Sequence, residues 1–297
     1  MTLLNRNFLF QSRPQLLSDN FVVWVLRIMA GVTSAVAVLI GIFLVKESIP
    51  ALREVGFSRF FVDGFWHPTD SAFGMAPMIL GTLLSTAGAV LIAGPLGLIS
   101  GIFIHFYLPE NLKNLYRRSQ EILAGVPSVV YGFWGLMVIV PVINNIEAPG
   151  ASLLAAIIVL TIMILPTMAL SADAAISSVP KSYIVAAQAL GLERAGIITT
   201  AVLPAAKSSL FAGVILSTGR AIGETMAVLM VCGNIVQVPT SVFDPIRTLT
   251  ANIALEMSYA VGTHRSSLFV SGLFLLGLII ILVLIAETLS RGKRYAN

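Results

Sequence analysis

The chain has 297 residues, of which 57% are hydrophobic and only 11% are charged, whereas soluble domains carry about 25% charged residues. This composition and a mean hydropathy of +0.93 exclude a soluble enzyme or a soluble binding domain and indicate an integral membrane protein. The net charge of +4 is typical of basic cytoplasmic loops in such a protein rather than of nucleic-acid binding. An internal disulfide is impossible because Cys232 is the single cysteine.

Hydrophobic runs predict six membrane-spanning helices, since about 20 helical residues cross a bilayer. They cover approximately residues 21–45, 77–105, 121–143, 151–173, 209–236 and 266–289. The first run is longer than the roughly 7–15 apolar residues of a signal peptide, so we expect it to remain as a helix. The predicted fold is therefore an all-α integral membrane protein with six transmembrane helices.

Lysine and arginine are concentrated in alternate loops, which predicts that both termini are cytoplasmic. The cytoplasmic pieces hold Arg6, Arg13, Lys113, Arg117, Arg118, Lys181, Arg194, Lys207, Arg291, Lys293 and Arg294. The outer loops hold Lys46, Arg53, Arg59, Arg247 and Arg265. We accordingly divide the chain into an N-terminal cytoplasmic tail (1–20), a first helix with an amphipathic outer loop (21–76), a core (77–289) and a basic tail (290–297). Within the outer loop we expect a short surface helix with its phenylalanines facing the membrane.

The fifth hydrophobic run contains an arginine near its centre and a glutamate four residues later, Arg220 and Glu224. Four residues are about one helical turn, so we expect the two side chains to share a face. A charge at that depth costs at least about 2.5–3.5 kcal/mol and persists only against protein, water or a ligand. Two interpretations remain open, a structural ion pair and an anion site on a transport path.

Two pairs of glycines are spaced four residues apart, a pattern typical of closely packed membrane helices. Gly97 and Gly101 lie in the second run, and Gly219 and Gly223 flank Arg220. The second pair predicts that Arg220 lies at a helix interface rather than in lipid.

Other polar side chains give little indication of catalysis or metal binding. His67, His105 and His264 are scattered without a ligand spacing, and no serine–histidine–aspartate set is visible. Asp173 and Glu121 lie at predicted helix ends, where carboxylates can simply be hydrated. The chain also lacks the Gly-x-x-x-x-Gly-Lys-Ser/Thr sequence that cradles nucleotide phosphates.

The cytoplasmic loop 174–208 is longer than a turn requires. It predicts a short helix, a break at Gly191 and a second helix that runs toward Leu203 and Pro204. An apolar face recurs at helical spacing, formed by Val179, Tyr183, Ala186, Ala187 and Leu190. Such a face binds a partner or folds back under the protein's own helices.

Within this loop, VAAQALGLERAGIITTAVLP resembles the coupling loop of ABC-importer permeases, whose pattern is E-A-A, three residues, Gly, nine residues and I-x-L-P. Val185 and Ala201 depart from that pattern, and the matching positions are Ala186, Ala187, Gly191, Leu203 and Pro204. LAGVPSVVYGFWGL, with Pro127, Ser128 and Tyr131, resembles the third-helix motif of phosphate-specific permeases. GRAIGETMAVLMVCGN and FWHPTDSAFGMAPMILGTLL are similar to the PstC type of subunit rather than to its PstA partner. The resemblance covers about residues 57–289.

The resemblance implies a type I ABC-importer permease in a bacterial or archaeal plasma (inner) membrane. Its implied partners are a PstA-like permease, two copies of a cytoplasmic PstB-like ATPase and a periplasmic or lipoprotein phosphate-binding protein, with no nucleic acid. ATP and magnesium would bind the ATPase, and this chain would hold no cofactor and perform no catalysis. Tyr183 and the matched residues of the coupling loop would meet the ATPase.

On the implied substrate path, Arg220 would offer planar donors to phosphate oxygens. Glu224 would neutralise Arg220 in the empty cavity or accept a hydrogen bond from protonated phosphate. Thr225 would add a hydroxyl donor, unless it bonds back to its own helix. Permeases for molybdate or sulfate, ion-coupled secondary transporters and intramembrane enzymes remain alternatives, although no internal repeat or catalytic constellation favours the last two.

Overall fold

The structure is a computed structural model and describes residues 17–291. The predicted tail residues Arg6, Arg13, Lys293 and Arg294 lie outside this range. The elements in chain order are α1 (Leu17–Glu54), α2 (Arg59–Val62), β1 (Trp66–His67), η1 (Pro68–Asp70), β2 (Ala72–Phe73), α3 (Ala76–Phe106), α4 (Glu110–Gly125), α5 (Ser128–Trp134), η2 (Gly135–Ile139), α6 (Val140–Asn144), α7 (Leu153–Ser177), α8 (Lys181–Ala189), α9 (Arg194–Ile197), η3 (Ile198–Val202), α10 (Leu203–Ile222), α11 (Met226–Val231), α12 (Leu249–Glu256) and α13 (Gly262–Arg291).

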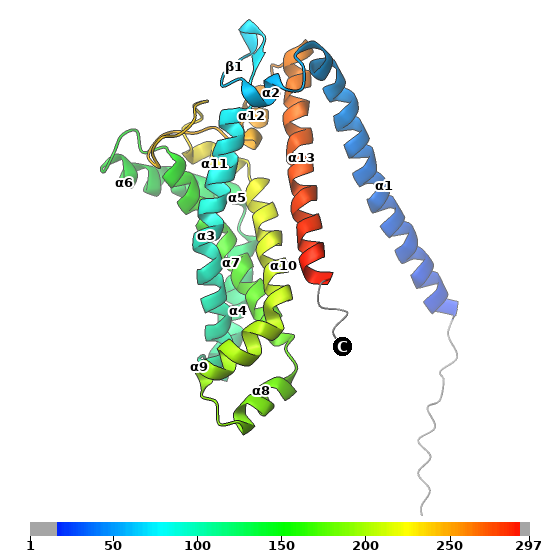
Figure 1. Cartoon of the computed structure of the whole chain (residues 1–297), viewed down its shortest axis with the longest axis vertical. Helices are drawn as coiled ribbons and strands as arrows, with labels where there is room; N and C mark the ends of the chain where they lie inside the picture. Colours follow the sequence, from blue (N-terminus) through cyan, green and yellow to red (C-terminus); the bar gives the residue numbers. More distant parts are fainter. Residues whose placement is uncertain (1–16, 292–297) are drawn as a thin grey trace, which may run out of the picture.

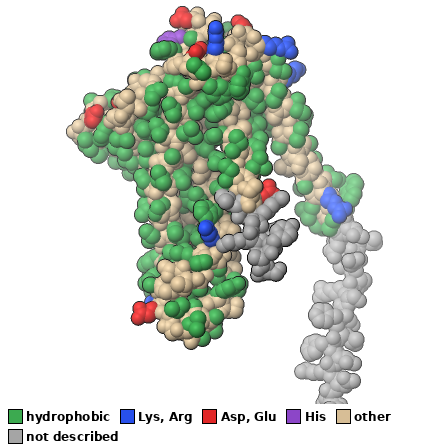
Figure 2. Space-filling view, in the orientation of Figure 1, with side chains coloured by type: hydrophobic (Ala, Val, Ile, Leu, Met, Phe, Trp, Pro, Cys, Tyr) green, Lys and Arg blue, Asp and Glu red, His purple; other side chains and the backbone are tan. Residues whose placement is uncertain are grey.

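The protein is an all-α bundle of elongated helices, with one two-stranded hairpin at one end (Figure 1). Five helical stretches within residues 17–291 are long and apolar enough to span a membrane, and a pair of helices joined at a bend of 86° would make a sixth span if it is counted as one. The five stretches and the bent pair correspond in position to the six predicted runs. Hydrophobic side chains cover much of the long sides of the molecule, and charged groups gather mainly toward the end with β1 and α12 (Figure 2).

The core of the bundle is the contact between α3 and α7, which pack closely along their lengths. A Cβ on Gly97 would lie 2.6 Å from Met168 Cβ, and one on Gly101 would lie 2.8 Å from Ala172 Cβ. Only glycine therefore allows the two backbones to approach this closely, which confirms the prediction for this glycine pair. The pair around Arg220 behaves differently, because a Cβ on Gly219 would meet nothing within 4 Å. Within residues 17–291 nothing packs closely against Gly219, so that part of the prediction is wrong, whereas Arg220 does lie at a helix interface, against α7 and α4.

The third span is bent because Pro127 interrupts it. Proline has no N–H to donate to the carbonyl four residues earlier, and it disfavours helical backbone in the residue before it. Val126 is accordingly extended, with φ −64° and ψ 130°. The polar helix α4 ends there, and α5 leaves at 86° to it.

The fifth span lies earlier in the chain than predicted, over Arg194–Ile222. The helix that contains Arg220 ends at Ile222, and Glu224 lies in a break before the short helix α11. The prediction of one continuous helix over 209–236 is therefore wrong. A hydrogen bond from Thr250 Oγ1 to the Glu224 carbonyl (2.8 Å) stabilises the break from outside. At its other end the span begins earlier, because the helical stretch continues from Arg194.

The predicted surface helix in the loop 46–76 is also replaced by other elements. Helix α1 continues to Glu54, and only the four-residue α2 follows it. Phe60 is fully buried, whereas Phe57 is 67% exposed. The beginning of α1 and the end of α13 both lie toward the end of the molecule that carries α8 (Figure 1).

Candidate anion site at Arg220

Arg220 lies in the last turn of α10, half-buried between α7 and the end of α4. Its Nη1 donates a hydrogen bond to Thr167 Oγ1 on α7 (3.1 Å). Its Nη2 donates to the carbonyl oxygen of Ala124 on α4 (3.4 Å). The guanidinium group is thus held by two neutral acceptors from two different helices.

The bend at Pro127 explains why the Ala124 carbonyl is available. In an uninterrupted helix it would accept the N–H of Ser128, but the chain turns away before that residue. The last carbonyls of a helix also carry the negative end of its dipole, so a guanidinium is a favourable partner there. The neighbouring Leu123 carbonyl accepts a hydrogen bond from Tyr131 Oη (2.8 Å). The third-helix motif residues Pro127 and Tyr131 therefore shape the surroundings of Arg220.

Glu224 does not pair with Arg220. Among the described residues no ion pair joins the two, because the helix ends between them. The Glu224 carboxylate instead accepts the N–H of Ala227 (3.2 Å) at the start of α11. The expected shared helical face, and with it the structural ion pair, is contradicted. Thr225 donates to the carbonyl of Gly223 (3.3 Å), which is a local bond to its own backbone.

The arrangement leaves Arg220 able to bind an anion. A guanidinium has five N–H donors, and two of them are used. The space beside Gly219 is open, and no carboxylate within residues 17–291 neutralises the arginine by an ion pair. The site combines a permanent positive charge with unoccupied donors.

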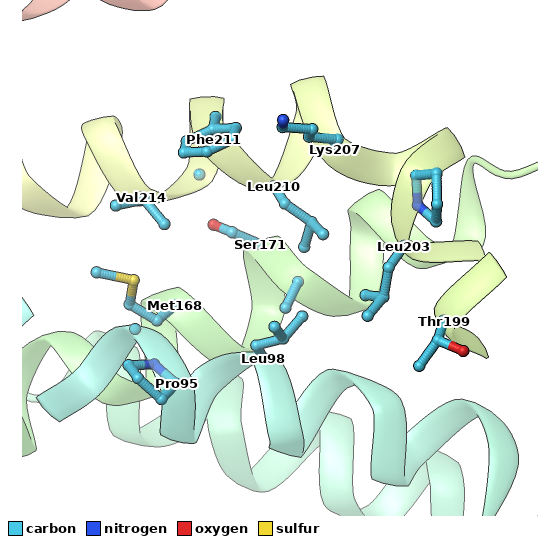
Figure 3. Close-up of a pocket in the computed structure, with 14 residues that line it drawn as sticks. Pro95, Leu98, Met168, Ser171, Thr199, Leu203, Lys207, Leu210, Phe211 and Val214 are labelled. Atoms are coloured by element: carbon cyan, nitrogen blue, oxygen red, sulfur yellow. The ribbon is translucent and has the colours of Figure 1, made fainter. Parts of the chain in front are cut away.

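An apolar cavity of about 750 Å³ lies on the α8 side of this site, between α3, α7 and α10. Figure 3 shows side chains from all three helices facing it, with Lys207 at the edge. Lys207 Nζ lies 5.7 Å from the centre of the Phe211 ring. Leu203 and Pro204, two residues of the coupling-loop motif, line this cavity in the first turn of α10.

The loop between α7 and α10 folds as predicted, with helix α8, a left-handed Gly191 (φ +75°) and a second helical stretch from Arg194. Part of its apolar face folds back against the protein's own helices, and part remains exposed, where it could bind a partner. Ala187 is buried against the ends of α7 and η3. Tyr183 (53%) and Leu190 (81%) are exposed, and Ala186 is exposed as well.

Two buried charged clusters were not anticipated from the sequence. At the α8 end, the carboxylate of Asp173 pairs with Arg117 and His105. Asp173 is only 7% exposed, so its expected hydration is wrong, whereas Glu121 is exposed. At the α12 end, Glu256 accepts hydrogen bonds from Trp66, 190 residues away in the sequence, and from the nearer Arg247 and His264. The partners of Asp173 are 56 and 68 residues away, too far for any spacing rule to connect them.

No group of three histidine, cysteine, aspartate or glutamate side chains within the described chain could hold a metal ion. His105 and His264 are instead members of the two charged clusters.

Residues 93–295 match the family described as "Binding-protein-dependent transport system inner membrane component". The "Probable ABC transporter permease protein YqgH" of Bacillus subtilis is 39% identical over 88% of this chain and 87% of its own length. The "Phosphate transport system permease protein PstC" of Mesorhizobium japonicum is 35% identical over 84% of this chain and 82% of its own length.

Solved structures show the same fold at lower identity. A bacterial ABC transporter involved in the import of alginate matches with a TM-score of 0.63 at 15% identity, over 95% of this chain and 100% of the other. The MetNI methionine ABC transporter matches with a TM-score of 0.56 at 18% identity, over 76% of this chain and 98% of the other. The membrane-spanning helices and these matches together establish that the chain belongs to the family of binding-protein-dependent transport system inner membrane components, with the type I ABC-importer permease fold.

Proposed function

We propose that this chain is the PstC-like permease subunit of an ATP-driven phosphate importer and that Arg220 binds phosphate on its path across the membrane. The observation that carries the proposal is the half-buried guanidinium of Arg220, held by Thr167 and the Ala124 carbonyl, with no carboxylate of residues 17–291 paired to it. Such a group can donate further charge-assisted hydrogen bonds to phosphate oxygens. The PstC relatives supply the identity of the anion.

Glu224 and Thr225 act next to this arginine without binding it. Because the Glu224 carboxylate caps α11, its role in the proposal is to fix the break that ends α10 just beyond Arg220. A glutamine retains a side-chain oxygen that can accept the same N–H. We therefore expect Glu224→Gln to retain most phosphate uptake and Glu224→Ala to lose more. Equal and complete loss in both variants would instead indicate that the negative charge itself is required.

The partners follow from the family and from the exposed face of α8. We propose that Tyr183, Ala186 and Gly191 lie against one of two PstB-like ATPase subunits, which bind ATP and magnesium, and that this chain binds no cofactor itself. The core 77–289 would pair with a PstA-like permease, and a phosphate-binding protein would deliver the anion at the α12 end. Both termini and α8 would lie on the cytoplasmic side of a bacterial or archaeal inner membrane, as the positive-inside rule favours.

The cargo is tested by uptake of labelled phosphate in cells that lack their own high-affinity system and express all the partner subunits. We expect uptake that a large excess of sulfate or molybdate leaves unchanged, and copurification of an ATPase with this chain. Inhibition by either competitor would assign another oxyanion to the same importer. Uptake by this chain without any ATPase would contradict the importer and favour an ion-coupled transporter.

The α8 contact is tested by crosslinking from single cysteines in a Cys232→Ala background. Native Tyr183 is 53% exposed. A cysteine at this position, Tyr183→Cys, should crosslink to the ATPase. Native Phe57 is 67% exposed and lies between α1 and α2, near the end of the molecule opposite α8 (Figure 1). Phe57→Cys is therefore the matched control and should not crosslink to the ATPase. Absence of any crosslink from α8 would count against the contact.

A further inference from the structure

The Asp173 cluster, formed by Asp173, Arg117, His105 and Ser177, joins three helices at the α8 end of the bundle. Arg117 on α4 donates two hydrogen bonds to the Asp173 carboxylate, from Nε to Oδ2 (2.7 Å) and from Nη2 to Oδ1 (3.0 Å). His105 Nε2, at the end of α3, lies 2.8 Å from Asp173 Oδ1 and 3.0 Å from Ser177 Oγ. A bidentate arginine–carboxylate pair fixes orientation as well as distance.

The same end of α7 is packed against α8. Ile176 in the last turn of α7, Val179 in the short connection and Ala187 on α8 belong to one buried apolar cluster. Phe106 at the end of α3 packs against that cluster. Because packed interiors transmit displacement rather than absorb it, a movement of α8 moves the end of α7 and, with it, the Asp173 carboxylate.

Helix α4 connects this cluster to the anion site. Arg117 and Ala124 are separated by seven residues of continuous helix, roughly 10 Å at 1.5 Å per residue. Arg117 binds Asp173, and the Ala124 carbonyl accepts a hydrogen bond from Arg220. Helix α4 also packs against α7. A displacement of Asp173 along the bundle would therefore change the position of one of the two acceptors of Arg220.

We infer that Arg117 and Asp173 are positioning residues, which transmit movement of α8 through α4 to the guanidinium of Arg220. The inference rests on the proposed function for the contact of α8 with the ATPase, for the anion site at Arg220 and for the identity of the anion. The movement itself is driven by nucleotide binding to the ATPase subunits and can be followed without any cargo. In this account, ATP-dependent closure of the ATPase repositions the Ala124 carbonyl and so changes how many donors Arg220 offers to its ligand.

The test is the nucleotide dependence of a thiol-labelling rate in the purified complete complex. A single cysteine replaces Leu123, whose side chain is 44% exposed, in a Cys232→Ala background. Labelling by N-ethylmaleimide is measured without nucleotide and with ATP and vanadate. We expect at least a threefold difference between the two states in the otherwise unsubstituted complex, and less than 1.5-fold after Arg117→Met. The rate of ATP hydrolysis by the Arg117→Met complex should stay within about twofold of the rate of the unsubstituted complex. A general loss of structure would decrease that rate further.

Arg118→Met is the matched control, because it removes a charge from the next position of the same helix, where the side chain is exposed. This variant should keep the full difference in labelling. If Arg117→Met does not assemble, Arg117→Lys retains the charge without the bidentate geometry and should lose at least half of the difference. The inference is overturned if the unsubstituted complex shows no difference, or if both substitutions of Arg117 retain it in full. A normal labelling difference in a complex that takes up no phosphate would refute the cargo and leave the inference intact.

Discussion

Thr167 supports Arg220 through one hydrogen bond, and its removal tests whether the orientation of the guanidinium matters for transport. The bond joins Arg220 Nη1 to Thr167 Oγ1 at 3.1 Å. Valine has the same shape without the hydroxyl, so Thr167→Val removes the acceptor and leaves the packing of α7 almost unchanged. A hydrogen bond to a charged group contributes about 1.5–3 kcal/mol, and a difference of about 1.4 kcal/mol changes an equilibrium tenfold. Because Arg220 is only half-buried, we use the lower end of that range and expect an approximately tenfold decrease in phosphate uptake.

The assay is the initial rate of labelled-phosphate uptake, normalised to the amount of assembled complex. Thr161→Val is the matched control, since Thr161 lies on the same helix and its hydroxyl bonds only to the carbonyl of Ile157 (2.7 Å) within α7. We expect that control to keep uptake within about twofold of the unsubstituted protein. If Thr167→Val and Thr161→Val cannot be distinguished, the hydrogen bond has no role in transport and the reasoning about Arg220 orientation is wrong.

Two further predictions concern packing and buried charge. Gly97→Ala places a methyl group against α7 and should destabilise the protein by about 1–3 kcal/mol. Gly219→Ala meets open space and should leave thermal unfolding of the purified protein unchanged. Equal effects of the two substitutions would contradict the close packing of α3 against α7 at Gly97. Arg247→Met leaves the buried carboxylate of Glu256 without its arginine, which costs about 3 kcal/mol and should lower the unfolding temperature. Lys113→Met breaks the exposed pair with Glu110 and should change the unfolding temperature little. A comparable decrease in Lys113→Met would contradict the greater contribution of the buried pair to stability.

The number of spans and the shape of the loop before α10 could be predicted because both depend on local properties of the chain. A run of apolar residues long enough to cross a bilayer is visible in the sequence, and so is a glycine at a position that requires a positive φ. Gly191 has φ +75° between α8 and the following helical stretch. The third-helix motif drew attention to Tyr131, but its contact with the Leu123 carbonyl depends on the angle of the bend and is not visible in the sequence.

The end of α10 could not be predicted, because apolar residues continue on both sides of it. The run from 209 to 236 is hydrophobic enough for one helix, and the break at Gly223–Thr225 depends on a hydrogen bond to Thr250, 26 residues from Glu224. The partners of Arg220 come from α4 and α7, 96 and 53 residues away. A charged residue in a membrane helix indicates that partners exist, but only the fold brings them together.

The most direct test of the role of Arg220 is phosphate uptake by Arg220→Gln in a complex that assembles normally. Arg27→Gln is the matched control, because Arg27 is exposed on a membrane-spanning helix, α1, remote from the site. We predict that Arg220→Gln abolishes uptake while the ATPase still copurifies, and that Arg27→Gln transports normally. Normal uptake by an assembled Arg220→Gln complex would contradict the assignment of Arg220 to the anion path.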